Sequence, residues 1–296
     1  MTVTYRVTHR TAYHYEADVA PGYSQLRLQP RDLPTQRCLT SRITVDPRPS
    51  DYREWTDFFG NRVAYVMIGT PHRSLTVTAE STVVVDGSGD GLTLFGDEPW
   101  EAVRDLVHDR RDAAAVDAAP FVLDSPLVRV SATFPDYARP SFTPGRALVE
   151  ALADLTSRIH GDFTFRPGAT SVTTALDDAF EQREGVCQDF AHVAIACVRS
   201  MGLAARYVSG YLETDPPAGW AKLQGSDVSH AWASVYVPAM GWVGIDPTND
   251  GFVGGRYVTT AWGRDYADVP PVSGVIFTNG GTAGLEVEVD VIPVPA

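Results

Sequence analysis

The chain has 296 residues, of which 44% are hydrophobic and 10% aromatic, a composition that excludes general disorder. No apolar run approaches the ~20 residues that a membrane helix needs. The N-terminus alternates like a strand at Val3, Tyr5 and Val7 and lacks the basic, apolar and cleavage regions of a signal peptide. We therefore expect a cytoplasmic protein without membrane contacts, long enough for two domains.

Charge excludes a further class of function. The chain has 37 acidic and 24 basic residues and a net charge of −13. Because such a surface repels phosphate backbones, we expect no nucleic-acid partner. The three cysteines, Cys38, Cys187 and Cys197, do not make a disulfide framework, and no HExxH or CxxC spacing occurs. We expect neither a cofactor nor a metal.

The N-terminal third of the chain predicts β structure. As far as about residue 86, short stretches of alternating apolar and polar residues are separated by Pro, Gly and Asp turns. Gly60-Asn61 predicts one hairpin. Several short antiparallel strands of this kind are typical of a β-sandwich.

Helical spacing begins near residue 99. Asp97 is placed to cap a first helix that runs through Val107. A second helix has clearer end signals: we expect Thr143 to cap it, Pro144 to occupy its first position and Gly161 to end it.

Two more helices and a set of strands complete the predicted elements. The helices span roughly residues 174–184 and 187–202, and strands follow at 204–212, 230–237 and 242–246. A last alternating stretch, 285–291, predicts a strand that returns to the N-terminal sandwich. The expected domains are a β-sandwich (1–95), a helical linker region (96–139), a catalytic core (140–268) and a C-terminal strand segment packed on the first domain (269–296).

Cys187 is the first candidate for chemistry. It follows a glycine-containing turn and opens an apolar-striped helix, where unpaired backbone N–H groups favour a thiolate and can hold an oxyanion. Asp189, in the same turn, works against the thiolate, so a basic partner is needed. A small buried core residue is the alternative for this cysteine, and it is the favoured interpretation for Cys38 and Cys197.

His230 and Asp246 are the candidate partners. On the strand SHAWASVYV the odd positions are small and apolar and pack inward, whereas the even ones, with His230, line something polar or open. Asp246 shares the face of His230 if the loop between the two strands has odd length, and an even loop would separate them. A structural histidine and a turn-starting Asp246 remain the alternatives.

Three aromatic residues are weaker candidates for substrate binding. Trp220 lies in the long loop from Glu213 to Ser229 that precedes His230, and such loops often bind substrate. Trp232 lines the cleft or packs under His230, and packing is favoured. Tyr211 is similarly ambiguous.

Three sequence blocks carry a family resemblance: GVCQDFAHVAIACVRSMGLAARYVSGYL, SHAWASVYV and GWVGIDPTN. Over roughly residues 140 to 265 they resemble the core of the transglutaminase-like superfamily. The stretches THRTAYHYEADV and GRDYADVPPVSGV resemble its bacterial subgroup with a β-rich N-terminal region. The resemblance implies an α+β fold, with an N-terminal antiparallel β-sandwich followed by a papain-like transglutaminase core.

The resemblance also implies roles for the three candidates. Cys187 would be the nucleophile, His230 the base and Asp246 the orienting acid, with chemistry through a thioester acyl-enzyme. Animal transglutaminases supply an oxyanion-site tryptophan upstream of the cysteine. No tryptophan lies between Trp100 and Cys187 here, so the second oxyanion donor is not identified.

Three functions stay open at this stage. The first is a metal-independent cysteine hydrolase that cleaves amide or isopeptide bonds of peptides or amino-acid conjugates. The second is an acyltransferase that passes the same acyl group to an amine. The third is a non-catalytic binding module. The sequence leaves the substrate and the oligomeric state undetermined.

Overall fold

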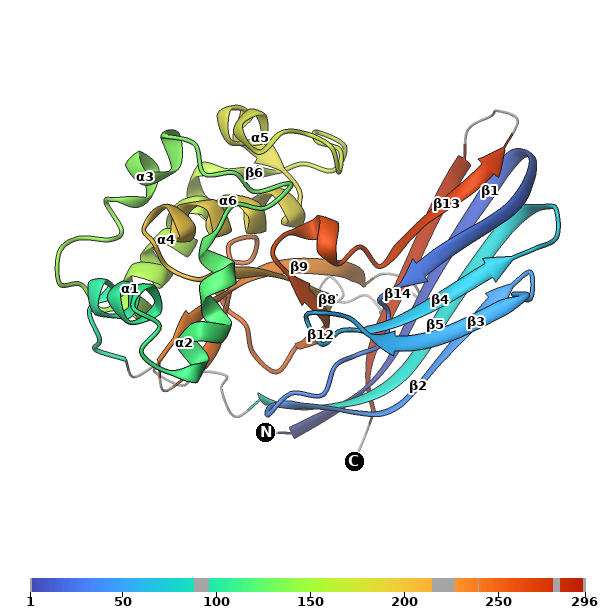
Figure 1. Cartoon of the computed structure of the whole chain (residues 1–296), viewed down its shortest axis with the longest axis horizontal. Helices are drawn as coiled ribbons and strands as arrows, with labels where there is room; N and C mark the ends of the chain where they lie inside the picture. The colour runs from blue at the N-terminus through green and yellow to red at the C-terminus, as the bar shows by residue number, and fades with distance from the viewer. Residues whose placement is uncertain (1, 88–95, 215–226, 239, 279–282, 295–296) are drawn as a thin grey trace, which may run out of the picture.

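The computed structural model of the chain has two parts, a helical part built on a central sheet and an elongated antiparallel β region (Figure 1). It describes residues 2–87, 96–214, 227–238, 240–278 and 283–294. Among these residues no helix is long and apolar enough to cross a membrane.

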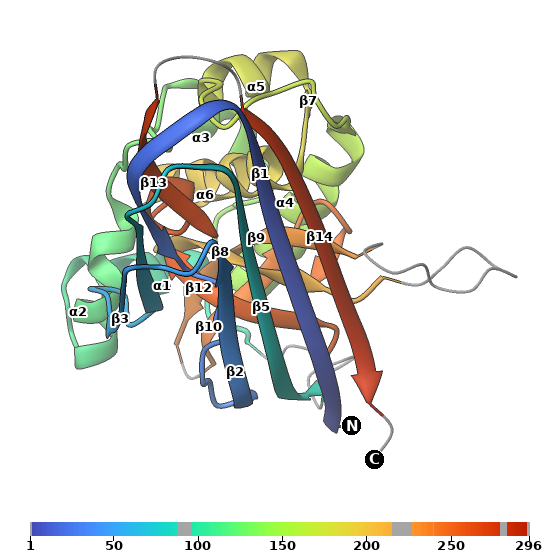
Figure 2. The same ribbon diagram turned by 90° about the vertical axis from the view of Figure 1, so that its right-hand side faces the viewer.

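The β region is a two-layered sandwich whose layers share one long strand. β1 pairs with β5 and β14 through its first half and with β4 and β13 through its second half, and a register shift separates the halves between His14 and Val19. The layers therefore have the orders β2-β5-β1-β14, which Figure 2 shows, and β3-β4-β1-β13. The strands are β1 (Thr2–Leu26), β2 (Gln36–Asp46), β3 (Asp51–Thr56), β4 (Arg62–Ile68), β5 (His72–Asp86), β13 (Val272–Thr278) and β14 (Ala283–Val294).

Apolar side chains from both layers fill the space between them, including Leu26, Val66 and Val77. The hairpin predicted at Gly60-Asn61 joins β3 to β4, and Gly60 has a φ of 75° there, which suits glycine. The C-terminal strand returns to the sandwich as expected, since β14 pairs with β1 over twelve residues from Thr4↔Val294 to Tyr15↔Ala283. The predicted α+β class is confirmed.

Helices cover one face of a five-stranded antiparallel sheet with the order β11-β10-β9-β8-β12. The strands are β8 (Ala205–Leu212), β9 (Val228–Val237), β10 (Gly241–Asp246), β11 (Gly251–Phe252) and β12 (Tyr257–Gly263). The helices are α1 (Trp100–His108), α2 (Ala113–Ala118), α3 (Thr133–Ala138), α4 (Leu148–Asp162), α5 (Leu176–Gln182) and α6 (Cys187–Ser200), with short 3-10 turns η2 (Ala119–Val122) and η3 (Tyr266–Asp268). A two-stranded parallel pair, β6 (Thr164–Phe165) and β7 (Glu184–Gly185), precedes α6.

Two predicted helix caps were wrong. The residue before α1 is Pro99 and not Asp97, and the residue before α4 is Ala147, because Thr143 and Pro144 form a separate turn. Neither helix has a side-chain cap. Thr143-Pro144 marks a turn that precedes α4, and it is not the first turn of that helix.

The odd positions of β9 pack inward against α6, as predicted: Ala231, Ala233 and Val235 belong to the same buried cluster as Val193 and Cys197. The even positions were predicted to line something polar or open, and the face is not open, although His230 does meet polar partners there. The even positions are buried too, since the sandwich and the loops that join its strands cover this face of the sheet. The residue pattern of a strand does not show that a second sheet packs on a face with polar residues, because that packing joins distant parts of the chain.

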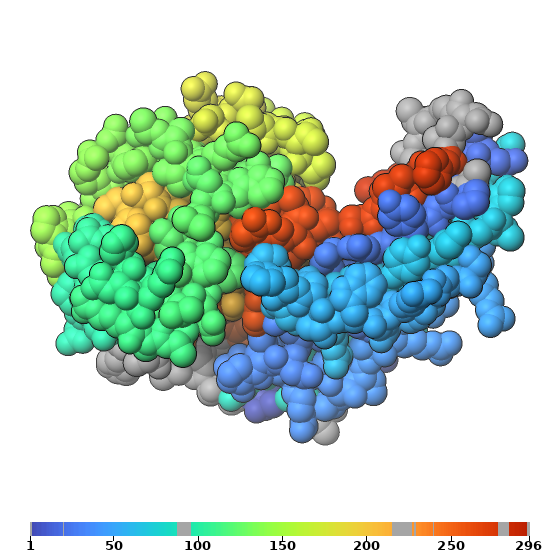
Figure 3. All heavy atoms as spheres, viewed as in Figure 1, coloured from blue at the N-terminus to red at the C-terminus, as the bar shows by residue number. Residues whose placement is uncertain are grey.

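The contact between the two parts combines apolar packing with hydrogen bonds. Val7 and Val85 of the sandwich pack on Tyr211 and Val258 of the central sheet. Gln36 Nε2 donates to the Thr259 carbonyl at 2.8 Å. Higher up, the molecular surface is hollowed between the helical part and the raised tip of the sandwich (Figure 3).

Candidate active site

Cys187 is the first residue of α6 and is partly buried. Val186 occupies the N-cap position in extended conformation, and its N–H donates to the Asp189 carboxylate at 2.8 Å. The Thr170 hydroxyl donates to the same carboxylate oxygen at 2.6 Å. A Cβ on Gly185 would lie 2.5 Å from Asp189 Oδ2, so only glycine fits at the entry to the helix.

This arrangement modifies the role expected for Asp189. Its charge is held by the N-cap amide and by Thr170, where it complements the positive end of the helix. Within the described part of the chain, no acceptor takes the backbone N–H of Cys187 or Gln188. These two N–H groups are the donors available beside the sulfur.

His230 and Asp246 form a buried pair, as the odd loop length required. β10 pairs with β9 from Gly241↔Val237 to Ile245↔Ala233. His230 Nε2 lies 2.6 Å from Asp246 Oδ2, and the two residues are 6% and 0% exposed. Because Nε2 faces the carboxylate, Nδ1 is the ring nitrogen left for another partner.

The pKa of His230 is raised to about 9. Burial by itself lowers it, but hydrogen bonding to Asp246 and Cys187, together with their negative charges, outweighs burial. The ring is therefore cationic at neutral pH. Burial raises the pKa of Asp246, yet the bonds from His230, Asn249 and Tyr257 lower it overall. The structure thus brings Cys187, His230 and Asp246 into one interacting set.

Two residues that the sequence analysis missed complete the surroundings of Asp246. Asn249 Nδ2 donates to Asp246 Oδ2 at 2.7 Å and lies 3.3 Å from His230 Nε2. The Tyr257 hydroxyl donates to the same oxygen at 2.8 Å. Asn249 follows Asp246 by three residues in a turn, a spacing that could have indicated it, whereas Tyr257 comes from β12 and no local pattern points to it.

The remaining candidates are the three aromatic residues that the sequence suggested for substrate binding. Trp232 is 2% exposed and packs between His230, at 6.1 Å between ring centroids, and Tyr257, at 5.3 Å. Tyr211 is 2% exposed and packs against His9 of the sandwich. Neither offers surface to a substrate in this structure. Trp220 lies outside the described residues.

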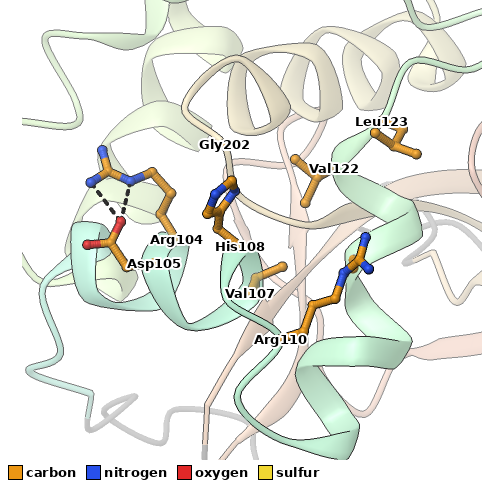
Figure 4. A pocket seen from close by; sticks show the side chains of 9 residues that line it. Arg104, Asp105, Val107, His108, Arg110, Val122, Leu123 and Gly202 are labelled. Carbon is orange, nitrogen blue, oxygen red and sulfur yellow. Dashed lines mark hydrogen bonds and ion pairs between the residues drawn. The ribbon is translucent and has the colours of Figure 1, made fainter.

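Other features of the chain do not join this site. No group of three His, Cys, Asp or Glu side chains among the described residues could hold a metal ion. A hollow of about 400 Å³ between α1, η2 and the end of α6 has Arg104, His108 and Leu123 in its wall and none of the three site residues (Figure 4).

Sequence and structure comparisons agree with this architecture. The bacterial transglutaminase-like N-terminal region matches residues 5–84, and the transglutaminase-like superfamily core matches residues 136–247. The chain is 46% identical to an uncharacterized protein of Mycobacterium tuberculosis over 99% of this chain and 93% of that protein. The chain belongs to the transglutaminase-like superfamily, in the branch with the bacterial N-terminal region.

Two further proteins that resemble this chain have names that state an activity. The chain is 31% identical over 115 residues to the protein-glutamine gamma-glutamyltransferase of Pseudomonas aeruginosa, a match that spans 38% of this chain and 17% of that protein. A Cytophaga hutchinsonii structure described as a candidate cysteine protease has a TM-score of 0.77 at 20% identity, over 100% of this chain and 92% of that one. The fold is thus that of cysteine-dependent hydrolases and acyltransferases.

Proposed function

We propose that the protein is a cysteine hydrolase that cleaves amide or isopeptide bonds in peptides or amino-acid conjugates. The observation that carries this proposal is the buried His230, held by Asp246 at 2.6 Å and interacting with Cys187. Burying the Asp246 carboxylate and supplying it with three side-chain donors costs free energy of folding. Orientation of the His230 imidazole is a function that explains why the fold buries this carboxylate.

The chemistry follows from the positions of the three groups. Because His230 already holds the proton in the resting site, Sγ of Cys187 attacks the carbonyl carbon as a thiolate while the N–H groups of Cys187 and Gln188 bind the oxyanion. His230 then gives its proton to the departing nitrogen as the C–N bond breaks, which leaves a thioester. Water attacks the thioester, His230 accepts its proton, and the acid is released as the C–S bond breaks, which restores the thiolate of Cys187 beside protonated His230.

Acyl transfer is the alternative, in which an amine replaces water in the last step. The name of the Pseudomonas aeruginosa relative favours it. A binding module without catalysis is the third candidate, and the intact set of Cys187, His230 and Asp246 speaks against it. The cytoplasmic location stays a prediction.

Cysteine alkylation separates an enzyme from a binding module. Iodoacetamide is applied across pH, and mass spectrometry finds the labelled residue. We expect selective labelling of Cys187 at neutral pH. Cys38 is an internal control, since it is also partly buried and burial raises its pKa. Labelling of Cys187 no faster than that of Cys38 would contradict an enzyme.

A second assay separates the two reactions. The protein is incubated with a glutamine-containing peptide and a dansylated amine, with Cys187→Ala as the blank. Ammonia release without incorporation of the amine identifies the hydrolase, whereas dansyl-labelled peptide identifies the acyltransferase.

A further inference from the structure

Arg206 is a buried cation at the junction between the central sheet and the sandwich. It lies on β8 and is 8% exposed. Its guanidinium carbon lies 3.6 Å from the centroid of the Trp262 ring and 4.1 Å from that of Trp242. Two aromatic faces therefore hold the guanidinium in place.

No anion in the described part of the chain compensates this charge. Among the described residues, Arg206 has no ion pair or hydrogen bond, and its buried Nε has no acceptor. Burial lowers the pKa of Arg206 well below its usual value, and the charge of Arg31 lowers it further. Arg199 shows the contrast: it is 3% exposed, yet donates to the carbonyls of Phe121 and Ala205 and to the Ser125 hydroxyl.

A second guanidinium comes to the same tryptophan from the sandwich side. The Arg31 Cζ lies 3.4 Å from the centroid of the Trp262 ring. Arg31 donates to the Phe59 carbonyl at 3.1 Å and to Asn61 Oδ1, but its buried Nε has no acceptor among the described residues. The acidic group that acts on Arg31 is Asp57, whose carboxylate already accepts from Arg27 and Asn61.

The residues around Arg206 are not all fully buried. Arg31, Trp242 and Trp262 each keep part of their surface exposed. Leaving a nearly buried cation unpaired beside a second cation is costly in a folded protein, and a planar guanidinium matches the oxygens of a carboxylate or a phosphate. A protein with a net charge of −13 does not attract such anions without a local site.

We propose that the junction is a binding site for a small oxyanion, a carboxylate or a phosphate, held by Arg206 and Arg31 beside Trp262. The site is separate from the set of Cys187, His230 and Asp246 and does not depend on the function proposed for it. Because Arg31 follows the sandwich strand β1 and Arg206 lies on β8, a bound anion ties the two parts together. Binding to the folded state alone then raises the unfolding temperature.

Tryptophan fluorescence and thermal unfolding test this site. The protein is titrated separately with inorganic phosphate and with acetate at constant ionic strength set by chloride. We expect a saturable fluorescence change and a rise in the unfolding midpoint with at least one of the two anions, and the stronger response identifies the oxyanion class. Arg206→Met should weaken binding by about tenfold or more, as loss of charged hydrogen bonds does.

Three variants keep the test decisive. Arg42→Met removes an exposed arginine of β2 and should bind like the unmodified protein. Arg206→Lys and Arg31→Met should also weaken binding, and they decide the matter if Arg206→Met does not fold. Absence of saturable binding of either anion overturns the proposal. Equal weakening by Arg42→Met also overturns it, since the effect would then be one of net charge.

Discussion

His192 is buried within α6 and His230 is buried beside the start of that helix, but their surroundings give the two rings different charge states. His230 is 6% exposed and its pKa is raised to about 9, whereas His192 is 4% exposed and its pKa is lowered to about 4. Burial lowers the pKa in both cases. Only His230 bonds to a carboxylate oxygen, at 2.6 Å.

The pKa values of the two histidines differ because the neighbouring carboxylates accept hydrogen bonds from different groups. Asp265 raises the pKa of His192 through space, but its oxygens accept the N–H groups of Leu127 and Ala267. His192 Nε2 instead accepts the N–H of Tyr266 at 3.2 Å, as a neutral ring does. A direct carboxylate contact therefore decides whether a buried histidine is a cation or a neutral structural group.

Removing the carboxylate charge at Asp246 should abolish the difference between the two histidines. In Asp246→Asn we expect acylation by p-nitrophenyl acetate at neutral pH to fall by about 10³-fold or more, because the imidazole loses its orientation and charge compensation. The rate of p-nitrophenol release measures this. Asp250→Asn is the matched control, since Asp250 is exposed and its carboxylate bonds Ser157. Equal rates in the two variants would contradict the role of Asp246.

Alkaline pH should remove the stabilisation that comes from protonated His230. A pKa raised from 6.5 to about 9 adds stability that is complete below pH 6.5 and is lost as pH rises through 9, for a total of about 3 kcal/mol. Urea unfolding at a series of pH values measures it. His230→Gln should lack this part of the pH dependence. An unchanged alkaline profile in that variant would show that His230 does not gain its proton on folding.

Acid pH, and not alkaline pH, should lower the folding stability through His192. Because folding lowers its pKa from 6.5 to about 4, the unfolded chain binds the proton more readily, and stability falls as pH drops below 6.5. Down to pH 5 the loss is about 2 kcal/mol. His192→Gln keeps an acceptor for the Tyr266 N–H and should flatten this part of the urea-unfolding profile. His14→Gln, at an exposed histidine, should leave it unchanged.

Tyr257→Phe should give the smallest effect, since it removes one of three side-chain donors to Asp246 Oδ2. We expect about a tenfold fall in the acylation rate, the effect of one hydrogen bond to a charged group. Tyr137→Phe is a control, because Tyr137 donates to the exposed Asp162 at the same 2.8 Å away from the site. The Thr248 N–H also donates to Asp246, at Oδ1 and 3.0 Å. A rate unchanged in Tyr257→Phe would mean that Asn249 and this N–H hold Asp246 without Tyr257.

Local sequence patterns were enough for the longer helices α1, α4, α5 and α6, for the strands β8, β9, β10 and β14, and for the register at the site. They did not predict α2, α3, β11, β12 or β13. An alternating strand has two faces, so the length of the β9–β10 loop decides whether His230 and Asp246 share one, and the observed pairing has the required parity. The exact helix starts were harder, because Thr143-Pro144 is a turn signal that also occurs outside helices.

The sequence by itself determined the placement of Cys187 at a helix start and the shared face of His230 and Asp246, since each follows from a short-range period or spacing. The α+β class followed from the family resemblance of the sequence blocks. Only the tertiary structure decided that the sandwich covers the far face of the sheet, that Tyr257 bonds Asp246, and that Arg206 and Arg31 share Trp262. These contacts join segments far apart in the chain, and their partners are chosen by packing and not by local conformational preference.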